Sequence, residues 1–172
     1  MAAISPDGYE RVRGSLVGGD GQRIGKYAVR REVGRGGMAV VYEAEDVELR
    51  RRVALKVIRD AESVERFHRE ARIAAQLQHS NIVAIHDVGS AQDGALPVHF
   101  IAMDFIEGVT LGQVIAEKRA NRPALLRMLE EVSRAVGHAH SKGGVHRDLK
   151  PGNVMVEPAG RVVLTDFGLA RS

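Results

Sequence analysis

Features that mark several classes of protein are absent from this chain of 172 residues. It contains no cysteine, which excludes a disulfide framework and thiol chemistry and fits a reducing interior. Its wholly apolar runs are a few residues long, whereas a membrane-spanning helix needs roughly 20. The first residues have no apolar signal core either. We therefore predict a cytoplasmic chain without a membrane segment.

A strong excess of one charge is also missing. Lysines and arginines number 25 against 22 aspartates and glutamates, and the basic residues are scattered along the chain. Nucleic-acid binding requires basic groups concentrated on one face, so it is not expected. What is present is 44% hydrophobic and 27% charged residues, the balance of a globular protein with a packed core. At this length we expect one domain, or a large part of one.

The first hundred residues are predicted to form a small antiparallel sheet with one helix. Residues 1–26 lack periodicity and are predicted to be a mobile leader. Tyr27, Val29 and Val33 then lie on one side of an extended segment that precedes a glycine loop and another strand. Apolar spacing predicts a helix over 64–79. Further strands are expected at 51–60, 81–88 and 98–105, with a turn over 89–97 between the last two.

The remainder is predicted to contain one long helix and short strands. After the polar stretch FIEGVTLGQ, the helix begins near Pro123 and stops at Gly143–Gly144, with proline near the start and glycine at the end as helix termini prefer. Short strands are expected at 144–145, 153–157 and 161–166. The apolar stripe of the helix comprises Leu125, Met128, Leu129, Val132, Val136 and Ala139.

The stretch VGRGGMAVVYEA, residues 33–44, places Gly34, Gly36 and Gly37 directly before stiff, β-branched residues. Glycine lets a backbone come close to a ligand, and loop amides can donate to phosphate oxygens. A glycine-rich hairpin turn is the simpler interpretation of these residues taken alone.

Three further features favour a phosphate-binding loop over a simple hairpin turn. Lys56 lies inside the apolar run VALKVI, where a charge is costly unless it is paired, and Glu70 on the predicted helix is an available partner. The loop HRDLKPGN, residues 146–153, places a carboxylate, a lysine and an amide close together. A second aspartate, Asp166 of DFG, directly follows an apolar strand.

Together, Gly34-x-Gly36-x-x-Ala39-x-Val41, VALK, Glu70, HRDLKPGN and DFG resemble the protein kinase superfamily. The wording GRGGMAVVYEA is similar to bacterial eukaryotic-like serine/threonine kinases, and the likeness covers about residues 27–171. It implies an α+β, kinase-like fold, with a small antiparallel sheet lobe and one helix, then the beginning of a mainly helical larger lobe. The implied division is a leader at 1–26, the smaller lobe at 27–104, and the hinge and first part of the larger lobe at 105–172.

The resemblance implies an ATP site. The loop 34–39 would cover the phosphates, and Lys56, held by Glu70, would bind the α- and β-phosphates. Backbone groups of 104–106 would contact the adenine edge, Met103 would gate the pocket behind it, and apolar side chains would enclose the base. The nucleotide-binding residues implied in this way are Gly34, Arg35, Gly36, Gly37, Met38, Ala39, Val41, Ala54, Lys56, Met103, Asp104, Phe105, Ile106, Met155 and Asp166.

It also implies a phosphoryl-transfer loop and bound Mg²⁺, with Mn²⁺ as a possible substitute. Asp166 and Asn153 would be the metal ligands, and Asp148 would accept the proton of a substrate hydroxyl. Lys150 would steady the transferred group and favours serine or threonine over tyrosine. Phosphoryl transfer asks mainly for positioning and positive charge, which these residue types supply. The implied catalytic residues are Lys56, Glu70, Asp148, Lys150 and Asn153, and the implied partner is a protein with a Ser or Thr acceptor.

Two departures from the family pattern have different consequences. The third glycine of the loop is Ala39, a change that a strand tolerates. The chain also stops four residues beyond Gly168, before the activation segment and substrate-binding helices of the family. We therefore expect a fragment of a longer serine/threonine kinase, which could carry a membrane anchor further along. By itself the chain is expected to bind ATP and to transfer little or no phosphate.

Three alternatives stay open. A pseudokinase-like module would bind nucleotide without catalysis, although all four key lysine, aspartate and asparagine positions are filled here. A small-molecule kinase of similar fold, such as an aminoglycoside phosphotransferase, would resemble HGDLHPGN, whereas this chain has Arg147 and Lys150. In a non-enzymatic interaction domain the glycines and charged loop residues would be structural, and their joint occurrence would be a coincidence.

Overall fold

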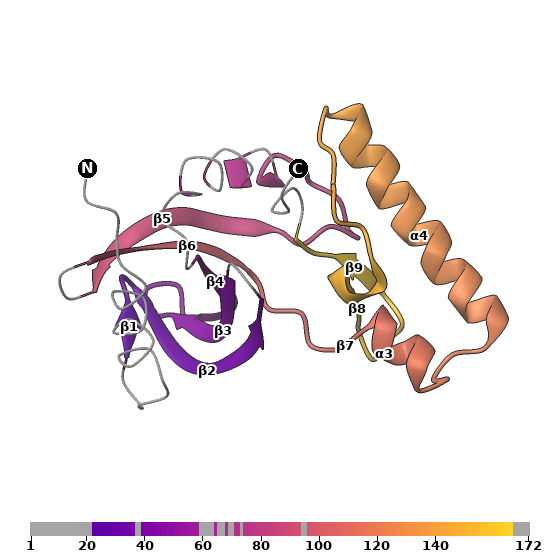
Figure 1. Ribbon diagram of the computed structural model, residues 1–172, viewed down its shortest axis with the longest axis horizontal. Helices are drawn as coiled ribbons and strands as arrows, with labels where there is room; N and C mark the ends of the chain where they lie inside the picture. Colours follow the sequence, from indigo (N-terminus) through magenta and orange to yellow (C-terminus); the bar gives the residue numbers. More distant parts are fainter. Residues whose placement is uncertain are drawn as a thin grey trace. The chain divides into compact units, whose positions relative to one another are not determined.

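The computed structural model describes residues 22–36, 39–58, 64, 68, 71–72, 74–93 and 96–166. The leader was predicted over 1–26, of which residues 1–21 lie outside the described residues, as do Gly37, Met38, Glu70, Phe167 and Gly168. Residues 22–26 are described, and they include the short strand β1 (Arg23–Ile24), in which Ile24 is fully buried. The chain divides into two compact units (Figure 1). The first comprises Met1–His68 and His86–Phe105, and the second comprises Arg69–Ile85 and Ile106–Ser172.

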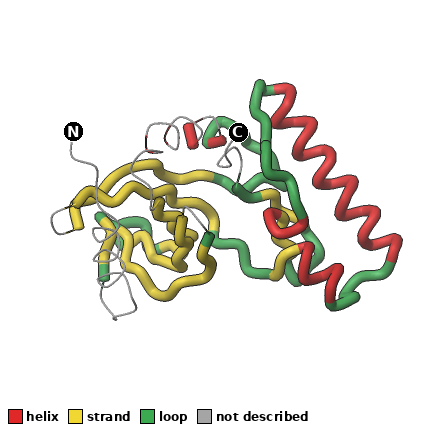
Figure 2. The backbone as a smooth tube through the Cα atoms, in the orientation of Figure 1, coloured by secondary structure: helices red, strands yellow, loops and turns green. Residues whose placement is uncertain are grey.

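The first unit contains a six-stranded sheet in the order β1-β2-β3-β4-β6-β5 (Figure 2). The pairs β1–β2, β2–β3, β3–β4 and β4–β6 are antiparallel, which confirms the antiparallel sheet predicted from the sequence. Its strands are β1 (Arg23–Ile24), β2 (Tyr27–Arg35), β3 (Ala39–Asp46), β4 (Arg51–Ile58), β5 (Ile85–Asp93) and β6 (Leu96–Asp104).

The core of the first unit covers one face of this sheet. On β4 the alternate residues Val53, Leu55 and Val57 are buried in it, because successive side chains of a strand point to opposite faces. The rings of Tyr27 and Phe100 meet edge to face with centroids 5.3 Å apart, a favourable aromatic arrangement. The intervening residues of β4 therefore lie on the opposite face.

The second strand corrects two predictions. Register shifts within 29–31 and within 32–34 break the alternation, since a bulge turns the following side chain to the other face. Val33 is therefore 41% exposed and does not share the buried side with Tyr27. The strand also continues to Arg35, so the connection to β3 is shorter than predicted.

Three other boundaries differ from the sequence prediction. Among the described residues, the helix predicted over 64–79 extends only to Ala74, where the chain turns. The strand predicted at 81–88 begins at Ile85, because the backbone before it pairs with β9 instead. The turn predicted over 89–97 is mostly strand, since β5 and β6 extend through polar residues by backbone pairing.

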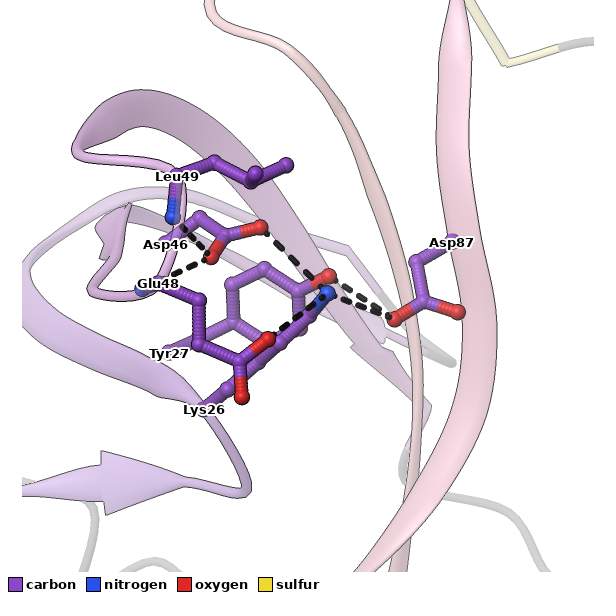
Figure 3. Close-up of polar contacts among 6 residues, drawn as sticks. All are labelled: Lys26, Tyr27, Asp46, Glu48, Leu49 and Asp87. Atoms are coloured by element: carbon purple, nitrogen blue, oxygen red, sulfur yellow. Dashed lines mark hydrogen bonds and ion pairs between the residues drawn. The ribbon is translucent and has the colours of Figure 1, made fainter.

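A cluster of polar groups joins the β1–β2 turn to the ends of two strands (Figure 3). Asp46 is fully buried, and its Oδ1 accepts hydrogen bonds of 3.2 and 3.1 Å from the backbone N–H groups of residues 48–49. Its Oδ2 lies 3.4 Å from Nζ of Lys26. The Tyr27 hydroxyl donates to Asp87 at 2.9 Å, and burial followed by this bond raises the pKa of Tyr27 above its ordinary value. Tyr27 therefore keeps its proton as a donor.

The second unit pairs a three-stranded antiparallel sheet, β7-β8-β9, with helices. Its elements are β7 (Val109–Thr110), α3 (Leu111–Ala116), α4 (Arg122–Ser141), the short 3-10 helix η2 (Pro151–Asn153), β8 (Val154–Val156) and β9 (Val162–Leu164). The last two confirm the strands predicted at 153–157 and 161–166. The strand predicted at 144–145 is wrong, because both residues are irregular.

The long predicted helix is confirmed as α4. Asn121 caps it by accepting a hydrogen bond of 3.0 Å from the backbone of Ala124, and Gly143 follows its end with φ of 76°. Its buried residues belong to the apolar core of the second unit. Leu129 of the predicted stripe is instead 51% exposed. In the described parts of the chain, no helix is both long and apolar enough to cross a membrane.

Candidate active site

Strand register gathers four predicted nucleotide-binding residues on one face of the first unit's sheet. Lys56 on β4 lies opposite Val41 on β3, and Ala54, two residues earlier, lies opposite Met103 on β6. Cross-strand partners point to the same side, and residues two apart on a strand share a face. All four side chains therefore lie on the face opposite the apolar core.

Lys56 is unusual among these residues because it carries a charge in a buried strand. It is 9% exposed, with apolar Val41 and Ile101 as its partners on the neighbouring strands. A buried ammonium group is costly unless an anion compensates it, so this position suits a residue that binds an anionic group. Glu70, the predicted partner of Lys56, lies outside the described residues, and the predicted pair stays a prediction.

The glycine-rich connection is tight, yet the protein itself does not require glycine there. The backbone N–H of Gly36 donates to the carbonyl of Ala39 at 2.8 Å and so closes the turn. A Cβ atom added at Gly34 would lie 4.0 Å from Val41, and one at Gly36 would lie 3.7 Å from the Ala39 carbonyl oxygen, which are ordinary contacts. Neither glycine has positive φ. Among the described residues, nothing excludes a side chain at either position.

The predicted adenine-contacting segment, residues 104–106, begins at the last residue of β6. The side chain of Asp104 lies 2.7 Å from Nε2 of His86 on β5. The Phe105 ring lies under the guanidinium group of Arg52, 4.5 Å from its centroid. Sequence reasoning identified neither His86 nor Arg52, because neither belongs to a motif.

The second unit holds the predicted catalytic base by short hydrogen bonds. Oδ2 of Asp148 accepts from Nζ of Lys150 at 2.6 Å and from Nδ2 of Asn153 at 3.1 Å. The same Asn153 amide group donates to the Asp148 backbone carbonyl at 2.8 Å. The bond from Lys150, followed by that from Asn153, lowers the pKa of Asp148, so the carboxylate is ionised at neutral pH. The structure thus brings these three predicted residues together.

Thr165 connects this loop to the end of β9, and sequence reasoning missed it. Its backbone N–H and its hydroxyl both donate to the carbonyl of Asn153, at 2.9 and 3.1 Å. Its own carbonyl accepts a bond of 2.8 Å from Nε2 of the buried His146. No periodicity marks Thr165, although its place directly before the DFG aspartate is a usable signal.

Two residues beside these bonds have strained backbones. Arg147 has φ of 63° and Asp166 has φ of 59°, a region that side-chain-bearing residues seldom occupy. Such conformations persist only where the surroundings impose them, and they cluster at functional sites. The hydrogen bonds of Thr165 and His146 on either side supply that constraint.

Met155, which was predicted to contact the nucleotide, and two histidines of the second unit have less specific surroundings. Met155 lies half-buried on β8, paired with Thr110 and Val163 in the register. His79 accepts a hydrogen bond of 3.0 Å from the Asn81 backbone, and its ring lies 5.1 Å from that of His138. These histidines therefore have structural contacts in the second unit.

The oxygen donors of the second unit fit a divalent cation that is bound together with a nucleotide. Mg²⁺ in such sites takes one or two protein ligands and completes its shell with phosphate and water oxygens. Asp166 supplies a carboxylate. Asn153 uses its amide nitrogen for Asp148, so its amide oxygen is the atom of that group suited to a cation.

Comparison with known proteins identifies the family of this chain. The family model described as the protein kinase domain matches residues 27–172. Serine/threonine-protein kinase PrkC of Bacillus subtilis is 42% identical over 157 residues, covering 87% of this chain and 24% of that protein. Serine/threonine-protein kinase PknA of Mycobacterium tuberculosis is 43% identical over 157 residues, covering 86% of this chain and 36% of that protein.

A solved structure gives the same answer for the fold. The Mycobacterium tuberculosis PknI kinase domain matches with a TM-score of 0.75 and 34% sequence identity, covering 89% of this chain and 64% of that one. The antiparallel sheet and the start of the helical part are those of the kinase fold, as the resemblance implied. The chain spans about a quarter to a third of the two curated relatives named above. Because the family model matches residues 27–172, which is most of the chain, this chain belongs to the protein kinase family.

Proposed function

We propose that this chain binds Mg-ATP and belongs to a kinase that transfers the γ-phosphoryl group of ATP to serine or threonine hydroxyls of proteins. The observation that carries this proposal is the arrangement of Asp148, Lys150 and Asn153, in which a base, a cation and a metal-ligand amide are joined by short hydrogen bonds. Membership of the kinase family supplies the reaction for which such a loop is suited. A cytoplasmic location stays a prediction.

The first unit would supply the nucleotide contacts. Gly34 and Gly36 carry no side chain that would keep phosphate oxygens away from the backbone of this turn. Lys56, buried on the same face of the sheet, would neutralise the α- and β-phosphates. Val41, Ala54 and Met103, on the same face of the sheet, would pack on the adenine, and backbone groups of 104–106 would bond its edge.

The second unit would supply the groups for transfer. Both side-chain donors contact Oδ2 of Asp148, so we assign Oδ1 as the atom that accepts the proton of the substrate hydroxyl. As that proton leaves, the hydroxyl oxygen bonds to the γ-phosphorus and the bond from phosphorus to the bridging oxygen of ADP breaks. Lys150 would lie beside the base and offset the negative charge of the transferred group.

Asp148 is a weaker base than an ordinary aspartate because its pKa is lowered. This suits phosphoryl transfer, in which orienting the nucleophile matters more than strong proton abstraction. Bound Mg²⁺ supplies charge neutralisation at the phosphates, and Asp166 and Asn153 are the residues that would hold it.

We further propose that this chain alone binds ATP with little or no transfer. It covers 64% of the PknI kinase-domain chain, so a substantial part of what that chain contains has no counterpart in these residues. The curated relatives named above are protein kinases, which favours a protein substrate over the small molecules of the aminoglycoside phosphotransferases. A pseudokinase-like module is the second candidate, since it too would bind without transfer.

Calorimetric titration of the purified chain with Mg-ATP tests the binding. We expect saturable, metal-dependent binding that weakens at least about tenfold in Lys56→Met, which corresponds to about 1.4 kcal/mol. Lys142→Met is the matched control, because Lys142 is exposed at the end of α4. Circular dichroism verifies folding in each case. A folded chain with no metal-dependent binding would refute the proposal.

Transfer needs a separate assay with radiolabelled ATP and a generic protein substrate. We expect incorporation near background for this chain. Incorporation that is robust and is abolished in Asp148→Asn would contradict the proposed inactivity of the chain alone while supporting the kinase reaction. To separate the pseudokinase-like alternative, the chain is extended with the remaining part of a related kinase domain. Activity in that chimera excludes the alternative.

A further inference from the structure

The last residue of β6 and the residue after it are contacted by side chains from two other strands of the same sheet. His86 of β5 contacts Asp104, and Arg52 of β4 covers the ring of Phe105. The four residues all belong to the first unit. Strand pairing itself fixes the backbone only as far as the last residue of β6, so these two contacts act where pairing ends.

Arg52 is oriented by a buried acid. Its guanidinium group lies 3.7 Å from Oε1 of Glu43, whose side chain is 8% exposed. Glu43 also accepts an ion pair of 2.7 Å from Arg31, so its charge has two cationic neighbours. Glu43 is opposite Ala54 in the register, which puts this acid on the face that carries the nucleotide residues. The guanidinium group, with this acid beside it, lies over the Phe105 ring at 4.5 Å from the centroid, a distance at which a cation–π contact is favourable.

His86 restrains Asp104, the residue before Phe105. Its Nε2 lies 2.7 Å from Oδ1 of Asp104, at hydrogen-bonding distance. Asp104 retains half of its side-chain exposure, whereas His86 is 17% exposed. The imidazole is therefore the more fixed partner, and it anchors the aspartate rather than the reverse.

We propose that Arg52 and His86 are positioning residues that hold Asp104 and Phe105 ready for adenine and so set the affinity for the base of the nucleotide. This inference rests on the proposed function, in which the backbone of 104–106 contacts the adenine edge. A segment that is already fixed loses less conformational entropy when the ligand binds. The contacts thus favour the bound state without touching the nucleotide.

Among the described contacts, neither substitution takes the last partner from a buried charge. In Arg52→Ala, Glu43 keeps its ion pair with Arg31. In His86→Ala, Asp104 is solvated because its side chain is 50% exposed. Both variants are therefore expected to fold, which circular dichroism and the thermal midpoint verify.

The experiment measures the dissociation constants of Mg-ATP and of adenosine for the wild type, the two alanine variants and the double variant. Each single variant should raise the dissociation constants of both ligands by about two- to fivefold, as expected for the loss of one cation–π contact or one partly exposed ion pair. The double variant should weaken both by about tenfold. Because adenosine has no phosphates, an equal loss for the two ligands assigns the effect to the base.

Conservative variants distinguish positioning from a general loosening of the sheet. His86→Gln keeps a side-chain N–H donor for Asp104 and should restore most of the affinity. Arg52→Lys keeps the positive charge but loses the planar group, so it should restore little. Arg30→Ala is the matched control, since it removes an ion pair to Glu45 on the same sheet and should bind as the wild type does.

The outcomes separate this inference from the function on which it rests. Wild-type binding combined with unchanged constants in the double variant would overturn the inference and leave the proposed function standing. Weaker binding of Mg-ATP with unchanged binding of adenosine would also overturn the inference, because the effect would then lie at the phosphates. A wild-type chain that binds no ATP would overturn both.

Discussion

The two units hold their candidate residues in different ways. In the first unit, Lys56, Ala54 and Val41 are placed by strand register, and every neighbouring pair of the sheet repeats the same constraint. In the second unit, Asp148 and Asn153 are placed by a few hydrogen bonds in a loop. A residue fixed by a whole sheet tolerates loss of one neighbour, whereas a loop residue depends on each bond. We therefore expect single substitutions to disturb the second unit more.

The glycines of the two units also differ, in whether the surrounding residues leave room for a side chain. Gly34 and Gly36 have room for a Cβ atom among the described residues, so the sheet does not require them. Gly108, which follows the 104–106 segment in sequence, has no room for a Cβ atom. A Cβ atom there would lie 2.2 Å from the carbonyl oxygen of Val156 and 2.8 Å from its carbonyl carbon. Glycine at 108 is thus required by packing, whereas packing among the described residues does not require glycine at 36.

The largest expected effect comes from Gly108→Ala. Because the added methyl group meets backbone rather than a flexible side chain, β8 or the preceding loop must shift, and we expect a loss of about 3 kcal/mol in the free energy of unfolding. Gly36→Ala should change that free energy by less than about 1 kcal/mol and weaken Mg-ATP severalfold. Urea unfolding followed by circular dichroism, together with calorimetry, measures both quantities. Equal losses of stability in the two variants would remove the distinction between these glycines.

A smaller effect is expected for Asn153→Ala. The variant removes two hydrogen bonds to Asp148, one to the backbone carbonyl and one to the carboxylate, at a cost of about 2 kcal/mol in the free energy of unfolding. Val41→Ala in the first unit, which removes part of one half-buried side chain, should cost about 1 kcal/mol. Urea unfolding of the two variants compares the loop with the sheet directly. A larger loss in Val41→Ala would reverse the comparison.

Much of the fold could be predicted because its strands follow a simple period. The run VALKVI was predicted as a strand from its apolar residues, and the structure adds that these residues alternate between the core and the opposite face, where Lys56 lies. Val33 was misplaced because bulges in β2 shift the register, and nothing in the apolar pattern marks a bulge. The helix α3 was missed although Thr110 and Gln113 form a capping box that the sequence displays.

The candidate site was less predictable because motif spacing gives residues but not contacts. The motif HRDLKPGN identified Asp148 and Asn153, and the structure adds that Thr165 ties their loop to β9. Arg52 and His86 reach the 104–106 segment from other strands, a relation that depends on strand order. Strand order is a long-range property, and a single sequence contains no local signal for it.

In the first unit, the polar cluster around Asp46 shows a residue whose position depends on a few hydrogen bonds and an ion pair (Figure 3). Asp46 is buried and accepts bonds from the turn after β3, and its second oxygen lies near Lys26. Burial pushes the pKa of Asp46 up, but the backbone bond from Leu49 and the charge of Lys26 outweigh it, so the pKa lies below its ordinary value. Ionised Asp46 therefore stabilises the folded chain.

The sign of the pH dependence follows from that lowered pKa. Its contribution is fully present above the unfolded-state value of about 3.9 and is lost as pH falls through the lower folded-state value. Asp46→Asn keeps an oxygen acceptor but loses the charge, so we expect it to cost about 1 kcal/mol at pH 7. Urea unfolding of both proteins between pH 7 and the acid limit of folding measures this difference. It should be constant down to about pH 5 and shrink below about pH 4, because protonated Asp46 resembles asparagine. If the difference in the free energy of unfolding between the wild type and Asp46→Asn persists unchanged in acid, the shape of Asp46 rather than its charge is what stabilises the chain. The ionised carboxylate would then not be a bond on which the first unit depends.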